Sequence, residues 1–368
     1  MTKVTPWDVS GKLDYTKLIK QFGVKEMQTL PKVFTENILF KRGTIFAQRE
    51  FKHIIEAVAN KKPFVMLTGL MPSGRFHIGH ALIAKQMIFY QSLGAKIYIA
   101  VADIEAYNTR GKTLEELREI AIEEYILNYV ALGLKPENVE IYFQSERSTD
   151  AKKASAYYRL QNQLSSHITF NEFKAVYGEV TPGKMVSALL QVSDILHPNL
   201  PEFEAKQLPI VVPVGIDQDP HIRITRDLAK RFKGAKFGPI CSTYNTFMPG
   251  LKGGKMSSSD PFSHIALTET PKEAKKKINK YAFSGGRETV EEHRKKGGNP
   301  DVDVSFQYLR MMFEEDDKKL AQIEDDYRSG KLLSGELKAI LIEKISTFLE
   351  EHQKKREKAR SQLKKFLK

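Results

Sequence analysis

Two histidines frame a glycine in the stretch MPSGRFHIGH, residues 71–80. His77 and His80 are three residues apart, so in the first turn of a helix they lie on one side. Gly79 between them lets a phosphate or a flat ring approach the backbone where a Cβ atom would clash. A neutral imidazole can donate a hydrogen bond to a phosphate oxygen. These residue types at this spacing predict a site for a phosphorylated ligand.

The stretch lies between an expected strand and an expected helix. FVMLTG, residues 64–69, is a short apolar run typical of a buried strand, and a helical pattern runs from about Ile78 to Leu93 and ends at Gly94. The turn Pro72-Ser73-Gly74 precedes that helix, whose N-terminus would offer unpaired N–H groups and the positive end of its dipole to an anion. On its own the motif is a moderate signal, because two histidines can also cap a helix or pack.

A second motif, KMSSS, lies far downstream at residues 255–259, within the glycine-rich stretch PGLKGGKMSSSDP. A loop of this composition could close over a nucleotide, bring Lys255 to its phosphates and open again for product release. Taken alone, the same letters also fit a flexible serine-rich linker.

The surrounding elements predict an α/β fold, with a Rossmann-like parallel sheet and an all-helical C-terminal part. KIYIAVAD (96–103), VEIYFQSE (139–146) and PIVVPVGID (209–217) are expected strands, and residues 113–133 an amphipathic helix. We expect an N-terminal extension over 1–60 and a catalytic domain over 61–268, with a helical insertion at about 150–200. A helical domain over 269–368 completes the chain.

Composition restricts the function classes. The 368 residues carry a net charge of +13, which suits a polyanionic partner or a solubilising surface equally well. The single cysteine, Cys241, excludes an intrachain disulfide and a cysteine zinc site, and no apolar stretch is long enough to span a membrane. With no secretory signal at the N-terminus, the expected location is the cytoplasm.

The pair of motifs resembles the signature of class I aminoacyl-tRNA synthetases, with H-I-G-H after the first strand and K-M-S-S-S after the last. Small nucleotidyltransferases are similar only in the first motif and lack the basic helical C-terminal part. A third hypothesis is an RNA-binding protein on a synthetase scaffold, although such relics usually lose part of the signature.

The segments 212–227, 168–178 and 283–309 look like tryptophanyl-tRNA synthetases of the archaeal and eukaryotic branch, whereas tyrosyl enzymes share only the I-D-Q core. This resemblance implies ATP-dependent activation of L-tryptophan to tryptophanyl-AMP and its transfer to tRNA(Trp). It also implies a homodimer with much of its interface at about 150–200, anticodon reading by the C-terminal helices, and Mg²⁺ that arrives with ATP rather than on a metal site of the protein.

The resemblance assigns site residues one by one. His77, His80 and Lys255 would be catalytic, and Glu105, Gln191 and Gln218 would read the α-amino group of tryptophan, since one carboxylate and two amide oxygens can accept its three N–H donors. The expected ATP-binding residues are Ser73, His77, Gly79, His80, Gly215, Asp217, Lys255, Met256, Ser257 and Ser258.

One part of the assignment has a gap. Leu67 and Ala100 occupy the positions expected to read the indole N–H, and neither side chain accepts a hydrogen bond. A buried N–H without a partner costs roughly 1–3 kcal/mol, so another acceptor is expected. Gln161, Gln163 and Asn171 are the candidates from the sequence, and tyrosine stays open as an alternative substrate.

Overall fold

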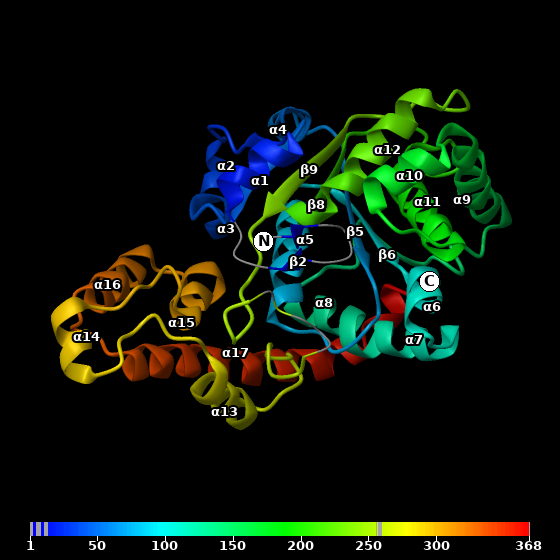
Figure 1. Ribbon diagram of the computed structural model, residues 1–368. Coiled ribbons are helices and arrows are strands. Elements are labelled where there is room, and N and C mark those ends of the chain that lie inside the picture. Colours follow the sequence, from blue (N-terminus) through cyan, green and yellow to red (C-terminus); the bar gives the residue numbers. More distant parts are fainter. Residues whose placement is uncertain (1–2, 5–8, 11–13, 255, 257–259, 368) are drawn as a thin grey trace.

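A seven-stranded, mostly parallel sheet forms the centre of the molecule (Figure 1). The computed structural model describes residues 3–4, 9–10, 14–254, 256 and 260–367. The strand order is β3-β4-β9-β8-β5-β6-β7, and β7, β6, β5, β8 and β9 run parallel. This is the doubly wound order in which the strand sequence reverses between β5 and β8, and ligands bind at the carboxyl ends of strands beside such a reversal. The strands are β3 (Lys25–Glu26), β4 (Ile45–Arg49), β5 (Val65–Leu70), β6 (Lys96–Val101), β7 (Val139–Phe143), β8 (Ile210–Gly215) and β9 (Ile240–Asn245).

The sheet is covered on both faces. Alternate residues of β5 and β6 point to opposite sides, so Met66 and Ile99 join one hydrophobic cluster while Leu67 and Ala100 join another. The first cluster includes residues of α4 (Lys52–Ala59), α5 (Ile78–Ser92) and α8 (Leu127–Leu132). The second includes residues of α9 (Ala151–Leu164), α10 (Phe170–Tyr177), α11 (Pro182–Leu196) and α12 (Asp219–Arg231). The class of fold predicted from the sequence is therefore confirmed.

Several expected elements form close to their predicted bounds. The strand at 64–69 is β5, and the helix at 78–93 is α5. The helix at 113–133 forms as α7 (Leu114–Ile120), a π-helical segment (Ala121–Ile126) and α8, and it ends at Gly133 with a positive φ of 114°. Gly133 can adopt this left-handed conformation without a Cβ clash.

The N-terminal part adds strands that the sequence pattern did not reveal. β4 pairs antiparallel with β9, and β3 pairs antiparallel with β4, so residues 25–49 extend the central sheet. The helices α1 (Tyr15–Phe22), α2 (Lys32–Thr35) and α3 (Ile38–Lys41) lie between or before these strands, and the short pair β1 (Lys3–Val4) and β2 (Val9–Ser10) forms a separate sheet. The unexpected β9 adjoins β8 and lies directly before the loop that carries the second motif.

From residue 270 onward the described part of the chain is helical, as the sequence predicts. α14 (Val290–Lys296), α15 (Val304–Tyr308) and α16 (Asp317–Arg328) form a lobe to one side of the sheet in Figure 1. α17 (Ser334–Arg360) runs from this lobe back beneath α8, and α13 (Pro271–Tyr281) packs against α17. No helix among the described residues has the length and apolar character that crossing a bilayer requires.

The basic end of α17 is anchored to the part of the chain that contains the sheet. Arg360 donates hydrogen bonds to both carboxylate oxygens of Glu123, at 2.8 and 2.9 Å, and Arg356 donates to the Glu123 carbonyl at 2.6 Å. His352 bonds to Asn128 of α8 at 2.7 Å. These contacts place the helical part and the sheet in one connected body, with the C-terminus near α6 (Asp103–Arg110) and α7 (Figure 1).

Candidate active site

The first motif forms a turn and helix start directly after β5. His77 is the N-cap of α5 with extended backbone angles, and its N–H donates to Nδ1 of His80 at 3.2 Å. The two imidazole rings stack with centroids 3.7 Å apart. Ser73, Gly79 and His80 thus lie on the turn or in the first helical turn, where the positive end of the helix dipole favours an anion.

Both imidazoles are held neutral. Burial holds the pKa of His77 well below its usual value, and the neighbouring His80 and His264 lower it further. Burial also lowers the pKa of His80 to about 3, with a further contribution from His264. At neutral pH these histidines can therefore act as hydrogen-bond donors toward phosphate but not as permanent cations.

The second motif meets the first at Gly79. A Cβ atom at Gly79 would lie 3.1 Å from the sulfur of Met256, so the glycine leaves the space that Met256 fills. The chain that follows pairs with the first motif as well, because Ile78 N–H donates to the Ile265 carbonyl at 3.1 Å and Leu267 N–H to the Phe76 carbonyl at 2.9 Å. The other three site residues expected in this motif, Lys255, Ser257 and Ser258, lie outside the described residues.

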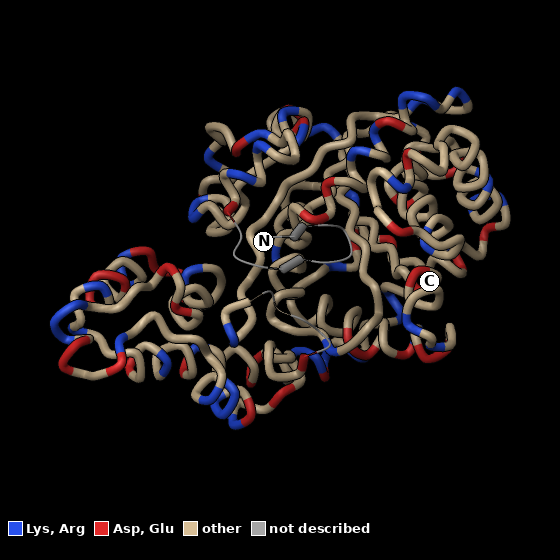
Figure 2. The backbone as a smooth tube through the Cα atoms, viewed as in Figure 1, with Lys and Arg blue, Asp and Glu red and all other residues tan. Residues whose placement is uncertain are grey.

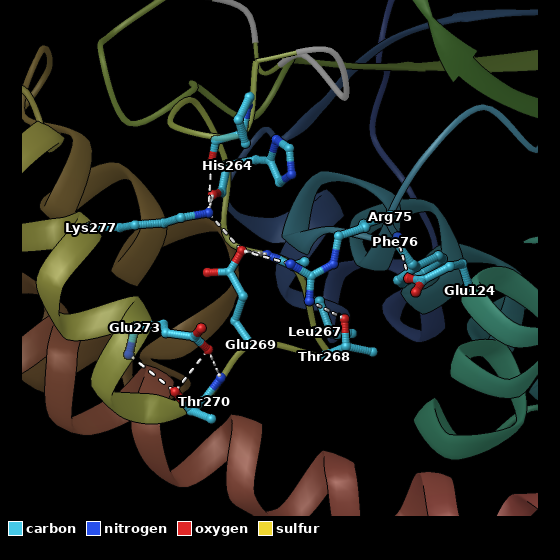
Figure 3. Close-up of polar contacts among 12 residues, drawn as sticks. Arg75, Phe76, Glu124, His264, Leu267, Thr268, Glu269, Thr270, Glu273 and Lys277 are labelled. Carbon is cyan, nitrogen blue, oxygen red and sulfur yellow. Dashed lines mark hydrogen bonds and ion pairs between the residues drawn. The ribbon is translucent and has the colours of Figure 1, made fainter.

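A buried carboxylate ties this pairing to the helical part (Figure 3). Glu269 receives a hydrogen bond from Lys277 of α13 at 2.6 Å and lies 3.7 Å from the guanidinium of Arg75 in the first motif. Lys277 also donates to the carbonyls of Pro261 and His264, at 2.6 and 3.0 Å. The segment after KMSSS is therefore fixed between α13 and the turn that precedes α5.

A cavity of about 540 Å³ opens at the reversal point of the sheet. Its walls come from the carboxyl ends of β5, β6 and β8, from α6 and from α11. All three residues expected to read an α-amino group, Glu105, Gln191 and Gln218, line it, and so does Gly215. The structure thus brings together side chains that lie up to 113 positions apart in the chain, as a site for one small polar-ended ligand requires.

Glu105 has a raised pKa. Burial raises its pKa to about 7, the negative charge of Asp194 raises it further, and Arg110 opposes the rise. An ammonium group entering the cavity would favour the ionised form of Glu105 and restore a lower pKa.

Gly215 and Asp217, both expected to bind ATP, lie at the end of β8 and in the turn that follows it. A Cβ atom at Gly215 would lie 2.5 Å from Asp217 Oδ1 and 2.6 Å from the Phe247 ring, so a larger residue cannot fit without displacing both. Asp217 is 4% exposed and receives a hydrogen bond from Gln218 at 3.2 Å. Its carboxylate is therefore held in place at the edge of the cavity.

The wall of the cavity bears on the open question of which group accepts the indole N–H. Leu67 and Ala100 line it as expected and offer apolar surface. The residues that we suggested as substitutes lie elsewhere, because the cavity wall includes none of Gln161, Gln163 and Asn171. The buried polar residues that line the cavity are Thr68, Gln144, Asp194 and His221, of which Gln144 follows β7 and Asp194 lies on α11.

Sequence reasoning missed Gln144 and Asp194 because neither belongs to a recognisable motif. Gln144 directly follows an apolar run, and Asp194 interrupts one. Asp194 accepts hydrogen bonds from Tyr142 at 2.7 Å, from Tyr157 at 2.6 Å and from Gln144 at 2.7 Å. Burial raises the pKa of Asp194 to about 6 against the lowering effect of these donors. The useful signal would have been position, since Gln144 directly follows β7, whose neighbour β6 carries the cavity residue Ala100 near the same end.

Cys241 lacks the surroundings of a reactive cysteine. It is fully buried on β9, and burial raises the pKa of its thiol to about 12. A thiol that is protonated at neutral pH is a poor nucleophile.

Fold, motifs and cavity together define a class I aminoacyl-tRNA synthetase, and the family model described as tRNA synthetases class I (W and Y) matches residues 59–350. Tryptophan–tRNA ligases from Methanocaldococcus jannaschii and Aeropyrum pernix are each 43% identical over 365 residues, which cover 98% of this chain and 96% of theirs. The chain belongs to the tryptophan–tRNA ligase family. These matches decide for tryptophan over tyrosine and against a small nucleotidyltransferase.

Solved structures agree with this assignment. The crystal structure of tryptophanyl-tRNA synthetase from Aeropyrum pernix superposes with a TM-score of 0.88 at 43% identity and covers 95% of this chain and 94% of its own. A tryptophanyl-tRNA synthetase from Encephalitozoon cuniculi, described as bound to tryptophan, superposes with a TM-score of 0.80 at 30% identity, covering 94% and 95%.

Proposed function

We propose that this ligase activates L-tryptophan with ATP in the cavity between β5 and β8 and then transfers the product, tryptophanyl-AMP, to tRNA(Trp). The observation that carries the proposal is that Glu105, Gln191 and Gln218 line one cavity at the same sheet edge as Gly215, Asp217 and the first motif. A bound amino acid would place its carboxylate between its own ammonium, held by Glu105, and a nucleotide at the start of α5.

The chemistry requires no nucleophile from the protein. The tryptophan carboxylate oxygen attacks the α-phosphorus of ATP, an O–P bond forms, and the bond to pyrophosphate breaks. The ribose hydroxyl of the terminal tRNA adenosine then attacks the acyl carbon, its proton leaves, and AMP departs. Catalysis consists of positioning and neutralisation of phosphate charge, with hydrogen bonds from His77 and His80 and the positive charge of Lys255.

In this proposal Mg²⁺ is bound by the substrate ATP. Among the described residues, no group of three or more His, Cys, Asp or Glu side chains is arranged to hold an ion. Mg²⁺ usually reaches such sites with a nucleotide and keeps most of its ligands from phosphate and water. We therefore assign Mg²⁺ to the ATP that binds here.

The helical part, residues 269–368, is proposed to bind the tRNA anticodon. Lys and Arg residues lie along α13 and α14, interspersed with acidic residues (Figure 2). Arg356 and Arg360 at the end of α17 are both engaged with Glu123. The exposed lysines of the same turns, Lys354, Lys355 and Lys358, remain available for phosphate contacts.

A homodimer in the cytoplasm completes the proposal. Three large apolar side chains are exposed on helices of one side of the molecule: Tyr107 on α6, Phe170 on α10 and Val186 on α11. Helices α6 and α11 contact one another through a hydrogen bond from Asn108 to Ser187 at 3.3 Å. Two of the three residues lie in the 150–200 insertion, and exposed apolar surface of this kind suits a partner subunit.

Mass spectrometry of the enzyme after incubation with ATP, Mg²⁺ and tryptophan tests the function. We expect enzyme-bound tryptophanyl-AMP, which disappears when tRNA(Trp) is added while tryptophanyl-tRNA forms. A protein that binds the tRNA but yields no adenylate would instead be an RNA-binding protein on a synthetase scaffold.

A further inference from the structure

The side-chain amide of Gln144 lies at the cavity wall with an acceptor to spare. Gln144 is 1% exposed and lines the cavity together with Leu67 and Ala100. Its Oε1 atom is buried, and no residue that the structure describes donates a hydrogen bond to it. A buried amide oxygen without a partner is costly, so such an atom points to a donor that arrives with a ligand.

The orientation of this amide is determined by its neighbour. Gln144 Nε2 lies 2.7 Å from Asp194 Oδ2, and an ionised carboxylate accepts hydrogen bonds but donates none. The nitrogen must therefore face Asp194, which leaves Oε1 on the opposite edge of the planar amide group. Asp194 itself is fixed by the hydroxyls of Tyr142 and Tyr157, both of which donate to its Oδ1.

The backbone around Gln144 is equally constrained. Its N–H donates to the Val101 carbonyl at 3.0 Å and continues the ladder between β6 and β7, and its carbonyl accepts from Tyr158 at 2.7 Å. The next residue, Ser145, donates its N–H to Asp103 at 3.0 Å. Gln144 is thus preorganised on the rigid sheet edge, where an acceptor gives specificity with little ordering cost.

We propose that Gln144 Oε1 accepts the indole N–H of tryptophan, with Asp194 as the residue that positions the amide. This inference rests on the proposed function and assigns a determinant of substrate choice that the signature motifs do not contain. The apolar side chains of Leu67 and Ala100 would contact the ring, and the polar readers Glu105, Gln191 and Gln218 would hold the other end of the amino acid. The amide oxygen would form a hydrogen bond with a ligand that carries an N–H. With a ligand that lacks this N–H, the buried oxygen would stay without a partner, which weakens binding.

The test combines a protein change with a ligand change. Gln144→Met keeps the length of the side chain and removes the acceptor, and β-(3-benzothienyl)alanine has the shape of tryptophan with sulfur in place of N–H. In the wild-type enzyme we expect the analogue to bind about 10- to 100-fold more weakly than tryptophan, because one buried hydrogen bond is lost. In Gln144→Met the two ligands should bind within about 3-fold of one another, as a coupled pair in a double-mutant cycle requires.

Matched measurements keep the outcomes distinct. Gln86→Met is the control, since Gln86 is also 1% exposed but does not line the cavity, and it should keep the wild-type ratio of affinities. Circular dichroism and thermal melting confirm that both variants fold. A Gln144→Met enzyme that still prefers tryptophan by the wild-type ratio would overturn the proposal and transfer the role to Asp194. Failure of the proposed function would show separately, as absence of adenylate formation in the wild-type enzyme.

Discussion

Gly79 and Met256 meet at the junction of the two signature motifs, where a Cβ atom on the glycine would lie 3.1 Å from the methionine sulfur. This contact joins the start of α5 to a loop that follows the last parallel strand. Because Phe76, Ile78, Ile265 and Leu267 add backbone hydrogen bonds at the same place, the position of one motif sets the position of the other.

Gly79→Ala should therefore slow adenylate formation more than it weakens tryptophan binding. The added methyl group must displace Met256 or the His77 ring by a few tenths of an ångström, and misplacement near reacting groups lowers rates by about 10- to 100-fold. Single-turnover kinetics with separate titration of tryptophan measures both quantities. Gly94→Ala tests a glycine with a positive φ at the other end of α5, where we expect lower stability and an unchanged rate per folded molecule. An equal loss of tryptophan affinity in Gly79→Ala would contradict this reading.

Tryptophan binding should depend on pH through Glu105. Its pKa of about 7 in the free enzyme means that, below neutral pH, a proton must leave before the ammonium can pair with the carboxylate. The dissociation constant should rise as the pH falls from 8 to 5.5, approaching about 10-fold per pH unit below the pKa. Calorimetry in buffers of different ionisation enthalpy should detect proton release on binding near pH 7.

Glu105→Gln supplies the matched variant for that titration. It should weaken tryptophan binding by about 2–5 kcal/mol, because the ammonium loses its carboxylate partner in an enclosed site. It should also flatten the pH dependence, leaving the smaller contribution of Asp194, and leave ATP binding unchanged. If Glu105→Gln weakened only the binding of ATP, the start of α6 would contact the nucleotide rather than the amino acid.

Lys277→Met should affect both stability and the chemical step. The substitution removes the cation that bonds to Glu269 and to two carbonyls after the KMSSS loop, so a buried carboxylate loses its shortest contact. We expect a loss of about 1–3 kcal/mol in the free energy of unfolding by urea and slower adenylate formation with tryptophan affinity unchanged. Lys276→Met, on the exposed side of the same helix, should be neutral in both assays. If the two variants behave alike, the network around Glu269 does not position the loop.

Substitution of the exposed lysines of α17 should impair the tRNA-dependent step and leave amino acid activation near normal. Replacing Lys354, Lys355 and Lys358 with glutamine should leave adenylate formation near normal, weaken tRNA binding and make its salt dependence shallower, since each lost phosphate contact reduces the slope by about one. A control triple at Lys20, Lys25 and Lys52 removes the same charge from the opposite end of the chain. Identical tRNA affinities for the two triples would show that the α17 lysines only solubilise the helix.

The sequence predicts the parts of this molecule whose residues carry local patterns. Apolar runs identify β5, β6, β7 and β8, and the strand-turn-helix context of H-I-G-H predicts which end of the sheet faces the nucleotide. The sequence pattern does not reveal β4 and β9, because their sequences, IFAQR and ICSTYN, mix polar and apolar residues. Their burial depends on the strands beside them, which are distant in the chain.

The proposed amino acid site could likewise be predicted from the sequence only in part. Glu105, Gln191 and Gln218 follow from resemblance, and the structure places them in one cavity. Gln144 does not follow, because its proposed role depends on Asp194 of α11, which fixes the orientation of its amide from a distant part of the chain. The partner of Arg356 likewise cannot be read from the sequence, because Glu123 lies more than 200 positions away in the chain.

The central claim is that the cavity at the sheet reversal selects tryptophan for activation, and pyrophosphate exchange into ATP measures it most directly. The assay is run with the wild-type enzyme and each of the twenty amino acids in turn, without tRNA. We predict exchange with tryptophan that exceeds the exchange with tyrosine and phenylalanine at least about 100-fold in kcat/KM, from the combined hydrogen bonds and fit of the cavity. Exchange that is equal or faster with tyrosine, or absent with all twenty, would contradict the account.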